Sequence, residues 1–302
     1  MIDIILGFGI FASAITINKL ILTTLPPFFF VGVRMLASGL IMLVFHAFRS
    51  PRMKMCHLKP DIKSLIIIGI LTTFIPSALK AFGLKYLISS KATLISSLDP
   101  FVTAIYAYFL WGERVNLRQI FGMCLAFSGI FLLLTRTSSV EQMIGGIGFL
   151  SWPEFATIAS MLIGRYGWIL AQRVLHAERY SPSELNAIIM TVGGSCSLIL
   201  SALLENPAQC CFPTNIGFWA VFTYSVTIGN IGGYTIYSTL LKKHPITLIS
   251  LCGISVPLYV HLYGPFILGE PLSAIFFVSF ILVAAGTFIF IRNKNKKSHL
   301  LA

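Results

Sequence analysis

Long apolar runs follow one another along the whole chain, with only short polar connections between them. A helix rises 1.5 Å per residue, so about 20 apolar residues are needed to cross the hydrocarbon core of a bilayer. Ten runs of about this length cover residues 4–24, 28–48, 64–84, 92–112, 117–135, 150–172, 184–204, 216–240, 246–268 and 273–291. The sequence therefore predicts ten transmembrane helices.

The composition agrees with this prediction. Of the 302 residues, 56% are hydrophobic and 11% are charged, and the mean hydropathy is +0.87. A soluble domain with this balance would expose far too much apolar surface. The runs lack the strict alternation of a transmembrane β-barrel, and lipid permits only helices and closed barrels. We therefore expect an all-α membrane protein.

The formal net charge of +12 could indicate nucleic-acid binding, but the positions of the charges indicate membrane topology instead. If the N-terminus lies inside, the inner connections and a basic tail at residues 293–302 carry most of the 22 lysines and arginines. Such an excess on the cytoplasmic side is the positive-inside bias. The pattern places both termini in the cytoplasm and predicts no nucleic-acid partner.

One unusual stretch occurs twice. Residues 98–115 read LDPFVTAIYAYFLWGERV, and residues 255–272 read SVPLYVHLYGPFILGEPL. An offset of 157 positions superposes their proline and their Gly-Glu pair, which chance similarity between apolar runs would not reproduce. Further matches near an offset of 155 extend the repeat to earlier helices. The chain is therefore predicted to hold two copies of one unit, residues 1–136 and 149–292.

Each copy would contain five helices, and an odd number has a topological consequence. A unit that starts inside the cell ends outside, so its second copy enters the membrane in the opposite orientation. Inverted repeats of this kind build a binding site near the midplane between the two halves, and rocking of one half against the other opens the site to alternate sides.

The repeated helix ends resemble a known family. A proline in the fourth helix of each half, a Gly-Glu ending and a fifth helix with glycine resemble the EamA type of the drug/metabolite transporter superfamily. The residues that carry the resemblance are Pro100, Gly112, Glu113 and Gly129 in the first half and Pro257, Gly269, Glu270 and Gly286 in the second. Asp99 departs from the family pattern, in which an apolar or small residue is usual. The resemblance implies a transporter of small organic molecules.

Four charged residues are expected to share one layer of the membrane. Lys19, Arg34, Lys80 and Asp99 lie about 6 to 10 Å from the outer ends of their helices. An ionisable group inside the bilayer costs roughly 2.5 to 3.5 kcal/mol on insertion scales, so these groups should pair or line water. Asp99 is too short to reach the headgroups, and we expect it to meet Arg34 or Lys80 as a binding, coupling or structural group. Arg165 is expected to extend to the membrane surface.

Helix breaks and aromatic side chains supply further candidates. Pro100 and Pro257 remove backbone hydrogen bonds at matching positions, which points to a site between the halves. Glu113 and Glu270 are expected to act as structural latches at two helix ends on opposite sides of the membrane. Residues expected to include ligand contacts are Asn18, Tyr106, Trp168, Asn230, Tyr234, Tyr237, Tyr259 and Tyr263.

These features predict a secondary transporter that works by alternating access. Arg34 and Lys80 would hold a carboxylate, Asp99 would hold an ammonium group, and tyrosines would stack on a ring. The favoured substrate is a zwitterionic amino acid or a derivative such as S-adenosylmethionine, which some members of the superfamily carry. Two alternatives stay open: an exporter of drugs or toxic lipophilic metabolites and, from another class, an integral membrane enzyme.

Sequence signatures of enzymes are nearly absent. The chain has no GxxxxGK[ST] and no HExxH motif, and we expect no catalytic activity, cofactor or metal. Ser77 and Lys80 have the S-x-x-K spacing of acylating enzymes, but no companion motif follows. The expected partners are a small-molecule metabolite and the lipid bilayer, with the chain as a monomer or homodimer in the bacterial inner membrane.

Overall fold

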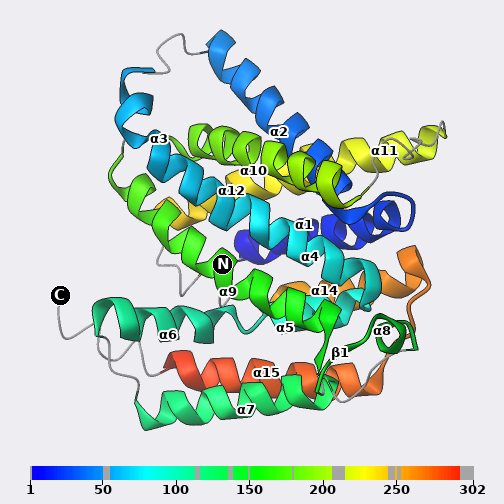
Figure 1. Cartoon of the computed structure of the whole chain (residues 1–302). Coiled ribbons are helices and arrows are strands. Elements are labelled where there is room, and N and C mark those ends of the chain that lie inside the picture. The colour runs from blue at the N-terminus through cyan, green and yellow to red at the C-terminus, as the bar shows by residue number, and fades with distance from the viewer. Residues whose placement is uncertain are drawn as a thin grey trace.

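A computed structural model describes residues 2–49, 55–112, 116–134, 139–148, 150–178, 180–205, 215–243, 249 and 253–292 (Figure 1). Nearly all of these residues are helical. The first helices are α1 (Ile2–Leu22), α2 (Pro27–Arg49), α3 (Met55–Gly69), the π-helical η1 (Ile70–Phe74), α4 (Ile75–Tyr86), α5 (Ser89–Ser96), α6 (Asp99–Trp111) and α7 (Leu117–Leu134).

A short helix and a small hairpin connect these helices to the second group. They are α8 (Ser139–Ile144), β1 (Gly146–Ile147) and β2 (Leu150–Ser151), and the antiparallel strands pair Gly146 with Ser151. The remaining helices are α9 (Trp152–His176), α10 (Pro182–Leu204), α11 (Ile216–Tyr224), the π-helical η3 (Ser225–Gly232), α12 (Gly233–Lys243), α14 (Ser255–Leu268) and α15 (Ala274–Arg292).

Four of the described helical segments are long and apolar enough to cross a membrane: Pro27–Phe48, Asp61–Tyr86, Ser89–Leu110 and Pro182–Leu204. Shorter apolar helices cover Phe8–Leu22, Leu117–Leu132, Ser255–Leu268 and Ala274–Phe290. Large apolar side chains cover the outside of the bundle, including Phe48, Ile216 and Phe266, which are 86%, 86% and 91% exposed. Such a surface requires lipid around it, so the prediction of a helical membrane protein is confirmed in its fold class.

The predicted helix boundaries need two corrections. The run expected at 92–112 is two helices, α5 and α6, separated at Ser97 and Leu98. The run expected at 64–84 begins earlier, because α3 starts at Met55 and continues through η1 into α4. Most of the first part of the run expected at 246–268 lies outside the described residues.

Local sequence signals explain where several helices begin and end. Ser151 and Ser181 accept hydrogen bonds from the backbone N–H groups of Glu154 and Glu184, whose carboxylates in turn accept from the serine N–H groups. These capping boxes, each followed by a proline in the first turn, begin α9 and α10. At other helix ends, Gly112 and Gly269 both adopt φ of +66°, a left-handed conformation that glycine adopts without steric cost.

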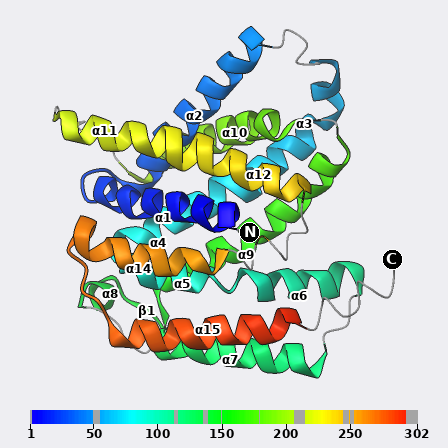
Figure 2. The ribbon, with the colours of Figure 1, turned by 180° about the vertical axis from the view of Figure 1, so that it is seen from behind.

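The helices pack in pairs from opposite parts of the chain. Helix α2 packs on α10, and α7 packs on α15 along one edge of the bundle, as the two views show (Figures 1 and 2). A Cβ atom added to Gly39 would lie 2.7 Å from the backbone N of Thr191, and one added to Gly194 would lie 2.4 Å from the backbone N of Leu36. Glycine therefore allows α2 and α10 to approach closely.

Glycine also allows a close approach between α7 and α15. A Cβ atom on Gly129 would lie 2.8 Å from the carbonyl oxygen of Ser279, and one on Gly286 would lie 2.5 Å from that of Gly122. Small residues at these positions let the two backbones meet, which is how membrane helices associate without a hydrophobic driving force.

Candidate functional site

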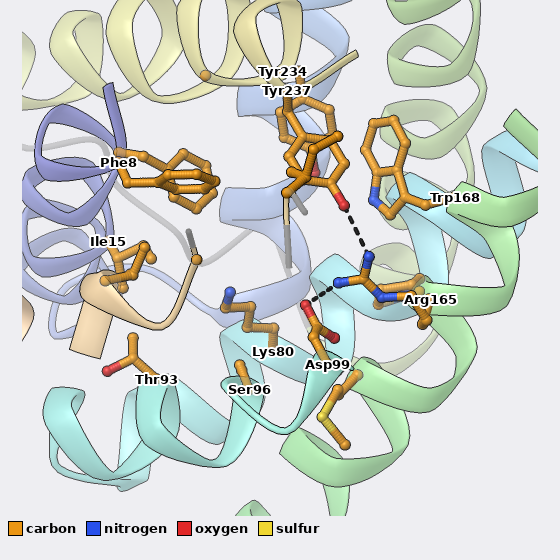
Figure 3. Close-up of a pocket in the computed structure, with 18 of the residues that line it drawn as sticks. Phe8, Ile15, Lys80, Thr93, Ser96, Asp99, Arg165, Trp168, Tyr234 and Tyr237 are labelled. Atoms are coloured by element: carbon orange, nitrogen blue, oxygen red, sulfur yellow. Dashed lines mark hydrogen bonds and ion pairs between the residues drawn. The ribbon is translucent and has the colours of Figure 1, made fainter. Parts of the chain in front are cut away.

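A cavity of about 230 Å³ lies inside the bundle. Side chains from α1, η1, α4, α5, α6, α9, α12 and α14 line it, so both parts of the chain contribute to it. Three of its described lining residues are charged: Lys80, Asp99 and Arg165 (Figure 3). Its remaining wall combines hydroxyl groups with aromatic and aliphatic side chains, the usual composition of a small-molecule site.

Asp99 and Arg165 form an ion pair at one side of the cavity. The Nη2 group of Arg165 donates to the Oδ2 atom of Asp99, and its Nη1 group donates to the hydroxyl of Tyr237 at 3.1 Å (Figure 3). The side chain of Arg165 is 4% exposed, whereas that of Asp99 is 31% exposed. The carboxylate is therefore neutralised on one side and still accessible to a ligand on the other.

This arrangement corrects two expectations. The described partner of Asp99 is Arg165 rather than Arg34 or Lys80. The expectation that Arg165 would extend to the membrane surface is also wrong, because its guanidinium group lies among Asp99 and Tyr237 at the cavity. In an isolated helix, Arg165 could extend to the membrane surface or turn toward the interior. Asp99 of α6 and Tyr237 of α12 bind it in the interior.

Lys80 enters the cavity from α4, and its ammonium group points toward the interior (Figure 3). Within the described part of the chain, it has no hydrogen-bond or ion-pair partner. A partly buried cation that is not bonded to an acid favours a ligand that carries a negative group.

Three aromatic side chains form a wall next to the ion pair. The ring centroids of Trp168 and Tyr237 are 4.7 Å apart, and those of Trp168 and Tyr234 are 5.8 Å apart. The Tyr234 hydroxyl lies 3.4 Å from Ser77 Oγ. These rings offer a surface on which a planar group could stack.

Other predicted binding residues lie outside the cavity lining. Arg34 packs its guanidinium group over the ring of Phe30 at 5.1 Å. Asn230 donates to the carbonyl oxygen of Arg34 at 3.2 Å and to the hydroxyl of Ser38 at 3.0 Å. Arg34 and Asn230 thus belong to the contact between α2 and η3.

Three predicted tyrosines have packing contacts instead. Tyr106 donates to the carbonyl oxygen of Leu162 at 3.0 Å. Tyr259 and Tyr263 stack on each other with ring centroids 6.2 Å apart. None of the three is among the described residues that line the cavity.

Lys19 and Glu270 lie together at one end of the bundle. The ammonium group of Lys19 is 2.5 Å from Glu270 Oε1 and also donates to the carbonyl oxygen of Leu87. The Glu270 carboxylate accepts from the backbone N–H of Ser89 at 3.0 Å and from its hydroxyl at 3.0 Å. Glu270 thus connects the end of α14 to α1 and to the first residue of α5. The matching Glu113 lies outside the described residues.

Beside this contact is a second ion cluster that the sequence reasoning missed. Lys91 of α5 is 2.6 Å from Glu141 of α8 and 2.6 Å from Glu154 of α9, and all three side chains are at most 5% exposed. No sequence signal brings these residues together, because their helices meet only in the folded chain. We name the set Lys19, Glu270, Ser89, Lys91, Glu141 and Glu154 the Ser89 end.

The two proline positions lie at helix starts. Pro100 is the second residue of α6, directly after the break at Ser97 and Leu98, and Pro257 is the third residue of α14. The first turn of a helix tolerates proline because its N–H groups have no intrahelical partner. The break before Pro100 places Ser96, Ser97 and Asp99 in the cavity lining.

The described residues contain no group of three or more His, Cys, Asp or Glu side chains that could hold a metal ion. The polar groups of the described lining are one carboxylate, two cations and several hydroxyl groups.

Sequence comparison places this helical bundle in a family. A model of the EamA-like transporter family matches residues 1–135 and 151–292. The chain belongs to the EamA-like transporter family. This confirms the resemblance found in the repeated helix ends, and it identifies the protein as a membrane transporter of a small molecule.

Individual relatives cover nearly the whole chain. An S-adenosylmethionine/S-adenosylhomocysteine transporter of Chlamydia trachomatis serovar L2 is 27% identical over 287 residues, which cover 93% of this chain and 86% of that protein. The transporter of the same name from Chlamydia muridarum is 26% identical over 298 residues, covering 93% of this chain and 88% of that protein. The uncharacterized transporter YyaM of Bacillus subtilis is 24% identical and covers 93% of this chain and 90% of that protein.

A solved crystal structure has the same fold. It is 17% identical in sequence, and it superposes with a TM-score of 0.68 over 95% of this chain and 94% of that chain. The helical arrangement described above is therefore known from an experimental structure, although this likeness says nothing about the substrate.

Proposed function

We propose that this EamA-like transporter carries S-adenosylmethionine or S-adenosylhomocysteine. The observation that carries the proposal is the cavity, which combines an ammonium group without a described acid partner, a partly exposed carboxylate and an aromatic wall. Such a ligand has a carboxylate for Lys80, an ammonium group for Asp99 and a purine for Trp168 and its neighbours. The printed names of the Chlamydia relatives support the same substrates.

The cavity does not suit the two other functions considered. A carrier of purely lipophilic compounds gains nothing from Lys80, whose charge is costly to place in a membrane. An acylating enzyme of the S-x-x-K type would pair Ser77 with Lys80, but the described contact of the Ser77 hydroxyl is with Tyr234.

Transport would proceed by alternating access between two inverted five-helix halves. Reciprocal contacts support this arrangement: Gly39 packs on Thr191, and Gly194 packs on Leu36, each shifted by 155 positions. Among the described residues, η1 at 70–74 shifted by 157 falls within η3 at 225–232. The glycines that end α6 and α14 share the same φ of +66°. A pseudo-twofold axis through the cavity accounts for all three relations.

The proposed orientation has both termini in the cytoplasm of a bacterial cell, with the protein in the inner membrane. The positive-inside bias supports it. The Ser89 end then faces outward, and its ion pairs hold α1 and α5 against α9 and α14 on that side. A single chain supplies the described walls of the cavity, so a monomer would be the transport unit even if two copies associate.

Exchange in proteoliposomes tests the proposal. Vesicles containing the purified protein and loaded with S-adenosylhomocysteine should take up external radiolabelled S-adenosylmethionine faster than protein-free vesicles. Unlabelled S-adenosylmethionine should compete, and adenosine or methionine alone should compete far less. Absence of uptake and exchange for both adenosyl compounds, with a protein that melts cooperatively, would overturn the proposal.

A further inference from the structure

The charges that line the cavity do not balance. Lys80 and Arg165 contribute two positive charges, and Asp99 contributes one negative charge. Asp99 is bonded to Arg165, and Tyr237 accepts a second hydrogen bond from that guanidinium group. In the described lining, one positive charge is therefore left over, and it lies on Lys80.

Other lysines inside the bundle show what the normal arrangement is. Lys19 contacts Glu270 at 2.5 Å, and Lys91 contacts Glu141 and Glu154 at 2.6 Å each. Lys80 has no corresponding carboxylate among the described residues, and the nearby Arg34 adds further positive charge. A charge inside the membrane without a bonded counter-charge is costly, so the position of Lys80 is best explained by a negative group that arrives with the ligand.

We infer that Lys80 is the specificity-determining residue for the carboxylate at the amino-acid end of the substrate. The inference rests on the proposed function. It adds that the carboxylate of the ligand contributes more to binding than its ammonium group does. The ligand carboxylate meets Lys80, which has no acid partner in the described part of the chain. The ligand ammonium group meets only Asp99, whose charge is already compensated by Arg165.

This difference predicts an order of affinities within one ligand series. S-adenosylhomocysteine has both groups, its carboxamide lacks only the negative charge, and its desamino analogue lacks only the ammonium group. Loss of a charge-assisted hydrogen bond costs about tenfold or more in affinity. The carboxamide should therefore bind at least about tenfold more weakly than S-adenosylhomocysteine, whereas the desamino analogue should lose less.

The test measures binding of the three compounds to the full-length protein in lipid nanodiscs by titration calorimetry. Lys80→Met keeps the length of the side chain and removes its charge, and Lys80→Arg keeps the charge. Lys85→Met is the matched control, because Lys85 lies on the same helix but contacts the ring of Tyr86 and does not line the described cavity. Thermal melting verifies that each variant is folded.

We expect Lys80→Met to bind S-adenosylhomocysteine about as weakly as the carboxamide and to lose the discrimination between these two ligands. Lys80→Arg should retain part of this discrimination, and Lys85→Met should retain all of it.

If the wild type binds S-adenosylhomocysteine and its carboxamide with equal affinity, the inference is wrong and the proposed function stands. The inference is also wrong if Lys80→Met still discriminates. If the wild type binds neither S-adenosylhomocysteine nor S-adenosylmethionine, titrated in the same way, both ideas are overturned. The wild-type comparison needs no variant, so the test holds even if Lys80→Met does not fold.

Discussion

Two lysines on consecutive helices, Lys80 of α4 and Lys91 of α5, have opposite environments. Lys91 lies at the Ser89 end between two carboxylates, and its side chain is 5% exposed. Lys80 lies at the cavity and has no bonded acid in the described structure. The first arrangement satisfies its charges within the protein and holds helices together. The second leaves a charge for a ligand, so the comparison separates residues that maintain the fold from residues that bind.

The largest expected effect comes from breaking the buried cluster. Lys91→Met leaves Glu141 and Glu154, which are 1% and 0% exposed, without their shared cation. Breaking a buried pair by removing one partner costs about 3 to 5 kcal/mol, so the melting temperature in detergent should fall sharply. Replacing both glutamates by glutamine in the Lys91→Met background should recover much of the loss. A melting temperature that does not change would show that the cluster does not hold these helices.

Asp99→Asn removes the negative charge from the described cavity lining. It should lower stability less than Lys91→Met does, but it should lower transport. Arg165 would keep Tyr237 as a partner and lose its carboxylate, a change of about 1 to 3 kcal/mol in the free energy of unfolding. Exchange in proteoliposomes should fall by about threefold to tenfold, because ~0.7 to 1.4 kcal/mol of lost binding gives that factor.

The double variant Asp99→Asn, Arg165→Met separates the two effects. Removing both charges should restore the melting temperature relative to Asp99→Asn, while exchange stays low. Recovery of exchange in the double variant would mean that the pair is structural and that neither charge is needed for the ligand.

Two tyrosines of α12, Tyr234 and Tyr237, differ in their hydrogen bonds and should differ in their contribution to stability. Tyr237 accepts a hydrogen bond from Arg165 at 3.1 Å, whereas the described contact of the Tyr234 hydroxyl is a longer one of 3.4 Å with Ser77. Tyr237→Phe should therefore lower stability by about 1 to 2 kcal/mol, and Tyr234→Phe by less than about 1 kcal/mol. Thermal melting of both variants tests this, and equal effects would show that the Arg165 contact contributes little.

Much of the architecture was predictable because membrane helices have a simple physical signature. Apolar runs of sufficient length indicated an all-helical membrane protein, and the repeated Gly-Glu endings indicated its family, which the comparison confirmed. Depth along a helix could also be estimated, since each residue adds about 1.5 Å. That estimate placed Asp99 and Lys80 in one layer, and both line the cavity.

The partners of the charges could not be predicted in the same way. Depth does not say which side of a helix faces which neighbour, so Arg34 and Lys80 were the expected partners of Asp99, and Arg165 was expected at the membrane surface. The packing of α6 against α9 brings Arg165 to Asp99, while Arg34 faces Phe30 and η3. Likewise, Glu141 and Glu154 come to Lys91 only through contacts between distant segments. Residue types and spacing carry no information about such contacts.

The smallest expected effect belongs to a lysine whose partner is exposed to solvent. Lys242 lies 3.9 Å from Glu178, and the two side chains are 34% and 79% exposed. Exposed pairs contribute about 0 to 1 kcal/mol because water and salt already screen their charges. Lys242→Met should therefore change neither the melting temperature nor the exchange rate appreciably, although it removes the same charge as Lys91→Met and Lys80→Met. If all three substitutions had similar effects, environment would not distinguish these lysines, and the assignment of Lys80 to the ligand would lose its basis.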